Sequence, residues 1–152
     1  MQLMEVMMNN HNFMRNIAVI SRCATAYREE RISKYGLTGN QAPYISIVCL
    51  NPSITPKEIA AKLHVNKSTV TRVIDKLEKN GFVKQVRSEE DKRVIQIFPT
   101  EKSEDIVDEV RNTFKDWRML LTEGLDENQL EMIEQLTELL AKRAIDINEN
   151  DI

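Results

Sequence analysis

The sequence predicts a mainly α-helical protein with a small β-hairpin. Over most of its 152 residues, apolar side chains recur at the three- and four-residue spacing of amphipathic helices. In the segments FVKQVR and RVIQIF, between residues 82 and 98, the spacing changes to the alternation of short strands. Aromatic residues make up only 5% of the chain, which has four glycines and four prolines. This composition favours helices over an all-β sandwich or barrel.

The first helix is expected over about residues 12–34 and should end at Gly36. Its apolar face carries Phe13, Ile17, Ile20, Ala24 and Tyr27. The second helix begins after Thr38 or Asn40. We favour Asn40 as its N-cap, because Pro43 then lies in the first turn, where its missing N–H costs no hydrogen bond.

The third and fourth helices are short and have clear start signals. Thr55 is expected to cap the third helix, with Pro56 in the first position and Glu58 closing a capping box. A short connection without glycine leads to the fourth helix, which Asn66 caps. Gly81 is expected to end that helix in a left-handed conformation.

Two longer helices are expected after the hairpin, one continuous from Thr100 to Gly124 and one from a cap of Asp126 and Gln129 nearly to the C-terminus. The apolar face of the first carries Val107, Val110, Phe114, Trp117 and Leu121. That of the second carries Leu130, Ile133, Leu136, Leu140, Ala144 and Ile147. These faces exceed what a small lobe covers, so we expect an interface between two copies.

Charge is distributed unevenly along the chain, whose net charge is −3. Residues 52–100 carry 10 basic and 6 acidic side chains, whereas residues 101–152 carry 6 basic and 15 acidic ones. A polyanion is therefore expected to bind the middle segment and avoid the C-terminal one. The alternative is that the acidic segment only keeps the surface solvated.

Two short helices followed by a charged hairpin are the pattern of a winged helix-turn-helix, whose second helix enters the major groove of DNA. At about 100° per residue, Val70, Ile74 and Leu77 share the core-facing side of that helix. The expected DNA-binding residues on its other faces are Lys67, Ser68, Thr69, Thr71, Arg72 and Lys76. Arg72 suits a bidentate contact with guanine, and Lys67 suits a phosphate. The alternative is an amphipathic helix whose outer face is only solvated.

The hairpin is expected to contact DNA through Arg87, Asp91, Lys92 and Arg93. An arginine at this projecting tip can enter a narrow minor groove, and Asp91 can hold the Arg93 guanidinium in place. On the fourth helix, Asp75 is expected either to orient Lys79 or to accept a hydrogen bond from cytosine. The alternative for the tip is an ordinary solvated turn.

At these residues the chain resembles the MarR family of bacterial regulators. The match is strongest in LHVNKSTVTRVIDKLEKNGFVKQVRSEEDKRVIQIFPTEK. Asp91, Arg93 and Thr100 fit the family's wing signature, whereas Pro99 stands where the family usually has leucine. The resemblance implies a homodimeric regulator, expected to be a repressor, on a pseudo-palindromic duplex. It also implies a dimerisation region in residues 1–37 and 101–152 and a DNA-binding lobe in residues 38–100.

Many proteins of this family are released from DNA by small phenolic or other amphipathic effectors. The resemblance implies a pocket between the dimerisation region and the winged lobe, for which Arg15, Tyr27 and Tyr44 are candidate polar residues. Core or surface roles are the alternative for each. Cys23 is expected to be a buried structural thiol, because reactive thiols need a polar, electropositive setting.

Other functional classes find little support. No cofactor or metal is expected, because His11 and His64 are far apart in the sequence and structural zinc takes four ligands. The two cysteines suggest no disulfide framework, and no segment has the ~20 apolar residues of a membrane span, so we expect a cytoplasmic protein. No nucleophile motif or phosphate loop indicates an enzyme. A winged-helix module that binds protein and not DNA remains the alternative.

Overall fold

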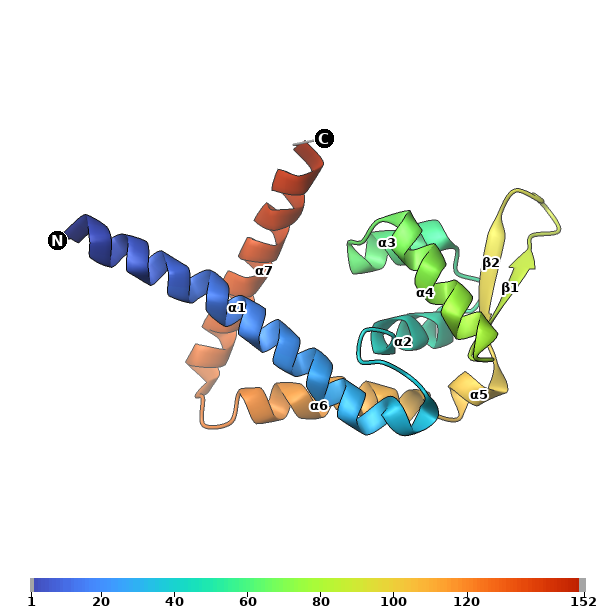
Figure 1. The fold of residues 1–152 in the computed structure, drawn as a ribbon, viewed down its shortest axis with the longest axis horizontal. Coiled ribbons are helices and arrows are strands. Elements are labelled where there is room, and N and C mark those ends of the chain that lie inside the picture. The colour runs from blue at the N-terminus through green and yellow to red at the C-terminus, as the bar shows by residue number, and fades with distance from the viewer. Residues whose placement is uncertain (1, 151–152) are drawn as a thin grey trace. The chain divides into compact units, whose positions relative to one another are not determined.

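The computed structural model describes residues 2–150, and the side chains of residues 12–149. It divides into two compact units, one ending at Trp117 and the other beginning at Arg118. The elements in chain order (Figure 1) are α1 (Gln2–Ile32), η1 (Ser33–Tyr35), α2 (Ala42–Leu50), α3 (Pro56–Leu63), α4 (Lys67–Lys79), β1 (Val83–Arg87), β2 (Ile95–Pro99), α5 (Glu101–Glu104), α6 (Val107–Leu121) and α7 (Glu127–Asn150). This confirms a mainly α-helical fold with one small hairpin.

Helix α1 begins at Gln2, well before the start near residue 12 that the sequence predicted. The start was predicted from the apolar face that begins at Phe13, which left residues 2–11 outside the helix. These residues lack glycine and proline, and leucine, methionine and glutamate favour a helix by intrinsic propensity. The predicted stop is confirmed: Gly36 has a φ of 77°, and its N–H donates to the Ser33 carbonyl oxygen at 2.8 Å.

The start of α2 differs from the prediction, because Gln41 and not Asn40 is its N-cap residue. A tight turn precedes the helix. The backbone N–H of Thr38 donates to Gln41 Oε1 at 2.9 Å, and the Gln41 N–H donates to the Thr38 carbonyl oxygen at 3.0 Å. Pro43 nevertheless lies within the first turn of α2, as expected.

The boundaries of α3 and α4 follow their local signals. Thr55 and Glu58 form the predicted capping box, in which Glu58 Oε2 accepts from the Thr55 N–H at 2.8 Å. Asn66 Oδ1 accepts from the Thr69 N–H at 2.9 Å. Gly81 has a φ of 78°, and the Phe82 N–H donates to the Leu77 carbonyl oxygen at 2.9 Å, which ends α4 as predicted.

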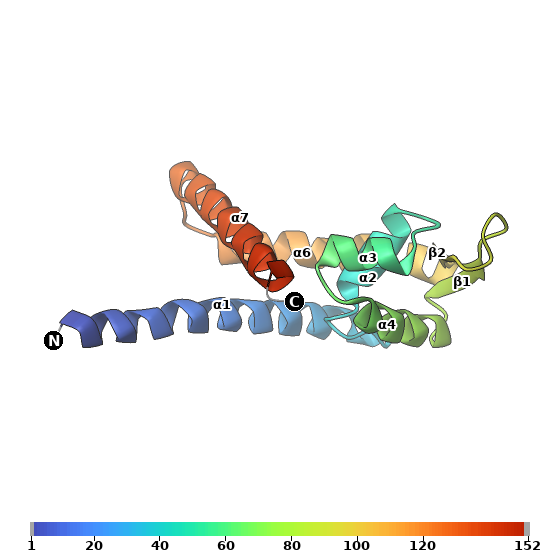
Figure 2. The same ribbon diagram turned by 90° about the horizontal axis from the view of Figure 1, so that it is seen from above.

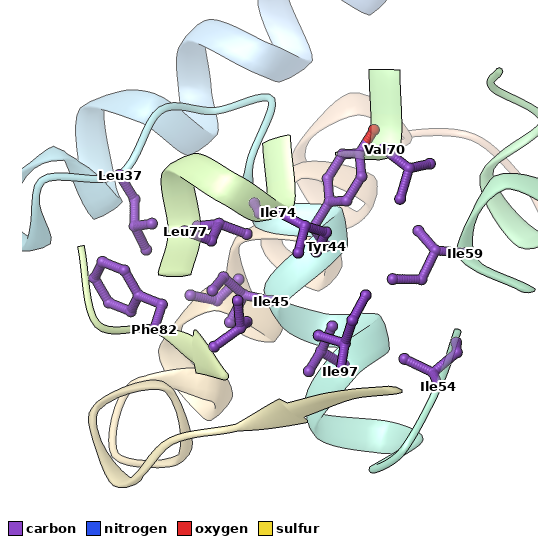
Figure 3. Close-up of a cluster of buried hydrophobic side chains, with 14 of the residues drawn as sticks. Leu37, Tyr44, Ile45, Ile54, Ile59, Val70, Ile74, Leu77, Phe82 and Ile97 are labelled. Atoms are coloured by element: carbon purple, nitrogen blue, oxygen red, sulfur yellow. The ribbon is translucent and has the colours of Figure 1, made fainter. Parts of the chain in front are cut away.

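The core of the winged lobe lies between α2, α3, α4 and the hairpin (Figure 3). Ile45, Ile59, Ile74, Leu77 and Ile97 are completely buried. Burial of each such side chain contributes about 1.5–3 kcal/mol of transfer free energy. Strands β1 and β2 are antiparallel, and an isolated bridge between Ile54 and Ile97 joins the hairpin to the segment before α3. This packing fixes the base of the hairpin against the lobe.

The continuous helix predicted from Thr100 is instead interrupted, giving α5 and α6 with a turn at residues 105–106. Ser103 is completely buried, and its hydroxyl donates to the Thr100 carbonyl oxygen at 2.8 Å. The Ile106 N–H donates to the carbonyl oxygen three residues back, that of Ser103, at 3.3 Å, which makes a tighter turn than an α-helix does. Such local serine bonds compete with a regular helix. The turn buries Ile106 and Val110 together with Ser103.

The C-terminal half of α1 lies beside α6 (Figures 1 and 2). The Tyr27 and Trp117 rings are 5.3 Å apart, and the Arg28 guanidinium lies 4.9 Å from the centre of the Phe114 ring. In the other unit, Asp126 and Gln129 cap α7 reciprocally, as predicted. Among residues 2–150, no helix has the length and apolarity needed to cross a membrane.

Candidate nucleic-acid interface

Helix α4 has one buried and one exposed face, as its residue pattern predicts. Val70, Ile74 and Leu77 are completely buried in the lobe's core, where Figure 3 labels them. The exposed side chains that were predicted to bind DNA are Lys67, Ser68, Thr71, Arg72 and Lys76, while Thr69 is half-buried. The core-facing residues therefore hold the basic face of α4 toward solvent.

The N-cap of α4 organises the hydroxyl groups beside it. Asn66 Oδ1 accepts from the Ser68 hydroxyl at 2.8 Å and from the Thr69 hydroxyl at 2.7 Å. The Thr71 hydroxyl donates to the Lys67 carbonyl oxygen at 3.0 Å. All three hydroxyl protons are thus used within the helix, so each hydroxyl must rotate before it can donate to a phosphate. The lysine and arginine side chains are the donors that already face outward.

Arg72 lies near the middle of this exposed face, and it makes no side-chain hydrogen bond or ion pair with any other described residue. Tyr44, from α2, belongs to the buried cluster of the lobe, where Figure 3 labels it. Burial raises the pKa of Tyr44, and the positive charge of Arg72 opposes that rise. Tyr44 therefore belongs to the core under the recognition helix, and Arg72 keeps its hydrogen-bond donors for a ligand.

The structure gives Asp75 a partner that the sequence did not predict. Its Oδ1 accepts from Gln85 Nε2 of β1 at 2.9 Å, and of its two predicted roles the pairing with Lys79 is not seen among the described residues. Gln85 was missed as a site residue. Its position in the strand was the available signal. Gln85 lies two residues after the buried Val83, on the same face of β1, where an apolar residue is the norm.

The wing tip is exposed and carries basic side chains, Arg87, Lys92 and Arg93, beside an equal number of acidic ones. Arg93 is 93% exposed, and its backbone N–H and Nε both donate to Asp91 Oδ1, at 3.0 and 3.3 Å. The Arg87 guanidinium donates to the Lys92 carbonyl oxygen at 3.2 Å. The Asp91–Arg93 contact is the one that the sequence predicted. In both ribbon views the tip extends away from the rest of the lobe.

The three candidate effector residues are dispersed. Arg15 is exposed on α1, Tyr27 packs against Trp117, and Tyr44 is buried in the core. A shallow cavity of about 290 Å³, wide open to solvent, does lie between α2 and α6, and none of the three lines it. Its lining residues are Pro43, Ser46, Ile47, Leu50, Arg111 and Phe114. Ser46 Oγ and Arg111 Nε are buried and lack a hydrogen-bond partner among the described residues.

The expectation of a buried Cys23 is wrong for the single chain, because this thiol is exposed. The side chain of the adjacent Ala24 is buried instead. Cys49, on α2, is half-buried, and burial raises the pKa of its thiol. A raised pKa disfavours the reactive thiolate at this position.

The two short helices and the basic hairpin define a winged helix-turn-helix protein of the transcription-regulator class. The family model that matches residues 37–95 is described as the MarR family. YwoH, an uncharacterised helix-turn-helix-type regulator of Bacillus subtilis, is 32% identical over 101 residues, which cover 66% of this chain and 73% of YwoH. YybA, a second uncharacterised regulator of that organism, is 26% identical over 132 residues, covering 87% of this chain and 88% of YybA. The chain belongs to the MarR family and is a MarR-type transcriptional regulator, not an enzyme.

The fold itself matches a solved structure of this family. A Listeria monocytogenes protein, described as a putative MarR family transcriptional regulator complexed with 26mer DNA, superposes with a TM-score of 0.80 at 22% identity. The match covers 88% of this chain and 89% of that one. The likeness shows that the winged arrangement of helices and hairpin is shared.

Proposed function

We propose that this chain is a homodimeric repressor that binds a pseudo-palindromic DNA duplex through α4 and the wing. The DNA-binding residues are Lys67, Ser68, Thr69, Thr71, Arg72 and Lys76 on α4, and Arg87, Asp91, Lys92 and Arg93 on the wing. Residues 38–100 form the DNA-binding lobe, and residues 1–37 and 101–152 form the dimerisation region. The protein acts in the cytoplasm, where its operator lies.

One observation carries the proposal: Arg72 is exposed on the outer face of α4 with its donors unused, while the opposite face of the helix is anchored in the core. An exposed guanidinium on a rigid helix suits the two acceptors that guanine presents in the major groove. Arg93 at the wing tip adds a second reading position in the minor groove. The excess of basic side chains in residues 52–100 attracts the phosphate backbone.

The dimer is supported by apolar faces that the single chain leaves exposed. On α1, Phe13, Ile17 and Ile20 are each more than 40% exposed. On α7, the exposed large apolar residues are Met132, Ile133, Leu136, Leu139, Leu140 and Ile147. Contiguous apolar surface of this kind marks an interface, and a two-fold dimer presents two copies of α4 to successive major grooves.

The test is selection of bound duplexes from a random pool, followed by affinity measurements over a range of salt concentrations. A pseudo-palindromic consensus is expected, because two identical lobes contact one duplex. The logarithm of affinity should fall linearly with the logarithm of salt, by about 0.9 per phosphate contacted. Absence of enrichment, with the protein folded and dimeric, would favour a module that binds protein.

The cavity between α2 and α6 supports release by a small amphipathic effector. Ile47, Leu50 and Phe114 supply apolar contact. Ser46 Oγ and Arg111 Nε are buried donors without a hydrogen-bond partner among the described residues, while Arg111 Nη1 pairs with Asp108 at 3.7 Å. Leaving such groups unpaired costs about 1–3 kcal/mol each, so a ligand that satisfies them gains affinity. An aromatic carboxylate or phenolate has the matching combination of an apolar ring and a compact anion.

This second part is tested with benzoate and simple phenols added to the preformed DNA complex. Release from DNA is expected for the wild type and should be lost in Arg111→Met, which keeps the length of the side chain but removes the guanidinium. Lys115→Met is the matched control, because it removes a positive charge from the same helix outside the cavity. Equal release from all three proteins would place the effector elsewhere.

A further inference from the structure

Gln85 joins the wing to the recognition helix through both its backbone and its side chain. The Gln85 N–H donates to Glu78 Oε1 at 2.7 Å. Gln85 Nε2 donates to Glu78 Oε2 and to Asp75 Oδ1, both at 2.9 Å. We call this set, Gln85 with Asp75 and Glu78, the wing clamp. Its acceptors are carboxylates, which strengthen the hydrogen bonds they accept.

The register of the hairpin explains why the Gln85 N–H is available. Gln85 pairs with Ile97, and the ladder continues to Ser88, whose N–H donates to the Val94 carbonyl oxygen at 2.9 Å. Because antiparallel pairs alternate between bonded and non-bonded, the Gln85 N–H points away from β2. Correspondingly, the Ile97 N–H donates to the Ile54 carbonyl oxygen on the other edge. The outer edge of β1 is thus closed by Glu78.

The wing clamp also controls charge on α4. Asp75 and Glu78 are the two acidic residues of that helix, and Asp75 stands on the exposed side between Arg72 and Lys79. A carboxylate free to approach a phosphate weakens DNA binding by like-charge repulsion. Gln85 engages both carboxylates with a neutral donor, so their charges remain but neither forms an ion pair with Arg72 among the described residues.

We propose that Gln85 is a positioning residue for DNA binding, which fixes the wing at the angle to α4 that lets Arg93 and Arg72 reach the same duplex. This inference rests on the proposed function and adds to it a residue that does not touch DNA. The hairpin base is packed in the core, but beyond Gln85 the wing projects into solvent. Among the described residues, the wing clamp therefore holds the last side-chain hydrogen bonds between α4 and the wing before the tip.

The test is a double-mutant cycle in the whole 152-residue chain between Gln85→Leu and Arg93→Ala. Leucine keeps the bulk of the side chain in the strand and removes its amide. Each single variant is expected to weaken binding to the selected duplex by roughly tenfold, while the double variant is little weaker than either, because a misplaced Arg93 no longer contributes. Gln96→Leu, on the opposite face of the same hairpin, is the matched control and should bind as the wild type does.

Multiplicative losses in the double variant, or undiminished binding by Gln85→Leu, overturn the inference. A role in stability alone predicts the multiplicative result, so the cycle separates the two. Should Gln85→Leu fail to fold, Gln85→Asn retains the amide but withdraws it by one methylene, and the same cycle is run with it. A wild-type protein that binds no duplex defeats the proposed function itself, whereas binding with an additive cycle defeats only the clamp.

Discussion

Asp91 and Arg93 form a closed contact at the tip of the wing, in which Asp91 Oδ1 accepts from both the backbone N–H and the Nε of Arg93. The arginine is 93% exposed, so this ion pair adds little to stability. It does restrict the directions in which the guanidinium can point, and its two terminal nitrogens remain open to a ligand. Preorientation of this kind lowers the entropy lost on binding.

Arg93→Ala should weaken binding to the selected duplex by about 1–3 kcal/mol while leaving the thermal unfolding midpoint unchanged, since the side chain is exposed. Fluorescence anisotropy and circular dichroism measure the two quantities. Glu90→Gln, also on the wing and exposed, should not weaken binding. Wild-type affinity for Arg93→Ala would remove the wing from the mechanism.

Arg72→Ala should cost about 1–3 kcal/mol, or roughly five- to 150-fold in affinity, and should relax the preference for guanine at one position of each half-site. Repeating the duplex selection with the variant tests the change in preference. Lys142→Ala removes the same charge from α7, in the acidic part of the chain, and provides the control. An equal loss on every sequence would mean that Arg72 contacts a phosphate and not a base.

Gly39→Ala should destabilise the protein by about 2–3 kcal/mol, because a Cβ at this position would clash with the Thr25 carbonyl oxygen. Gly39 lies against α1, where its N–H donates to Glu29 Oε2 at 3.0 Å and its carbonyl oxygen accepts from Arg28 Nε at 3.4 Å. Urea unfolding gives the free energy of each variant.

Gly36→Ala is the comparison for this prediction. Gly36 has a positive φ but open space around it, so its substitution should cost only the backbone strain, about 1 kcal/mol. If Gly36→Ala proved the more damaging of the two, the close approach of the Gly39 segment to α1 would be disproved.

Stability should fall in acid through the loss of a contact between η1 and α6. Lys34 Nζ lies 2.6 Å from Glu109 Oε1, and this hydrogen bond, with a second one from the Tyr35 hydroxyl, lowers the pKa of Glu109 below 4.5. A carboxyl group whose pKa is lower in the folded than in the unfolded protein stabilises the folded state at pH values above its unfolded-state pKa. That contribution is lost as the pH falls through the folded pKa.

The measurement is the free energy of unfolding of the wild type and Glu109→Gln between about pH 6 and about pH 3. The wild type should be the more stable at the upper end, with the difference shrinking toward the lower end. Lys34→Met removes the principal cause of the shift and should flatten the pH dependence in the same way. A difference that did not vary with pH would exclude the titration of Glu109.

Local chemistry determined most of the helix boundaries. Thr55, Asn66 and Gly81 act on atoms no more than a few residues away, so their side chains and backbone freedom specify the ends of α3 and α4 without knowledge of the fold. The basic outer face of α4 and the Asp91–Arg93 pair could also be predicted, because helix periodicity and a two-residue spacing are equally local.

Tertiary packing decided the rest. The partner of Asp75 is ten residues away on a strand, the break between α5 and α6 depends on burying Ser103, and the α2–α6 cavity joins residues far apart in the chain. In each case the local sequence allows more than one contact. The Asp75 carboxylate, for example, could pair with Lys79 on its own helix or with Gln85 on β1. Burial of the core sets how the helices and strands are placed, and that placement decides which of the alternative contacts forms.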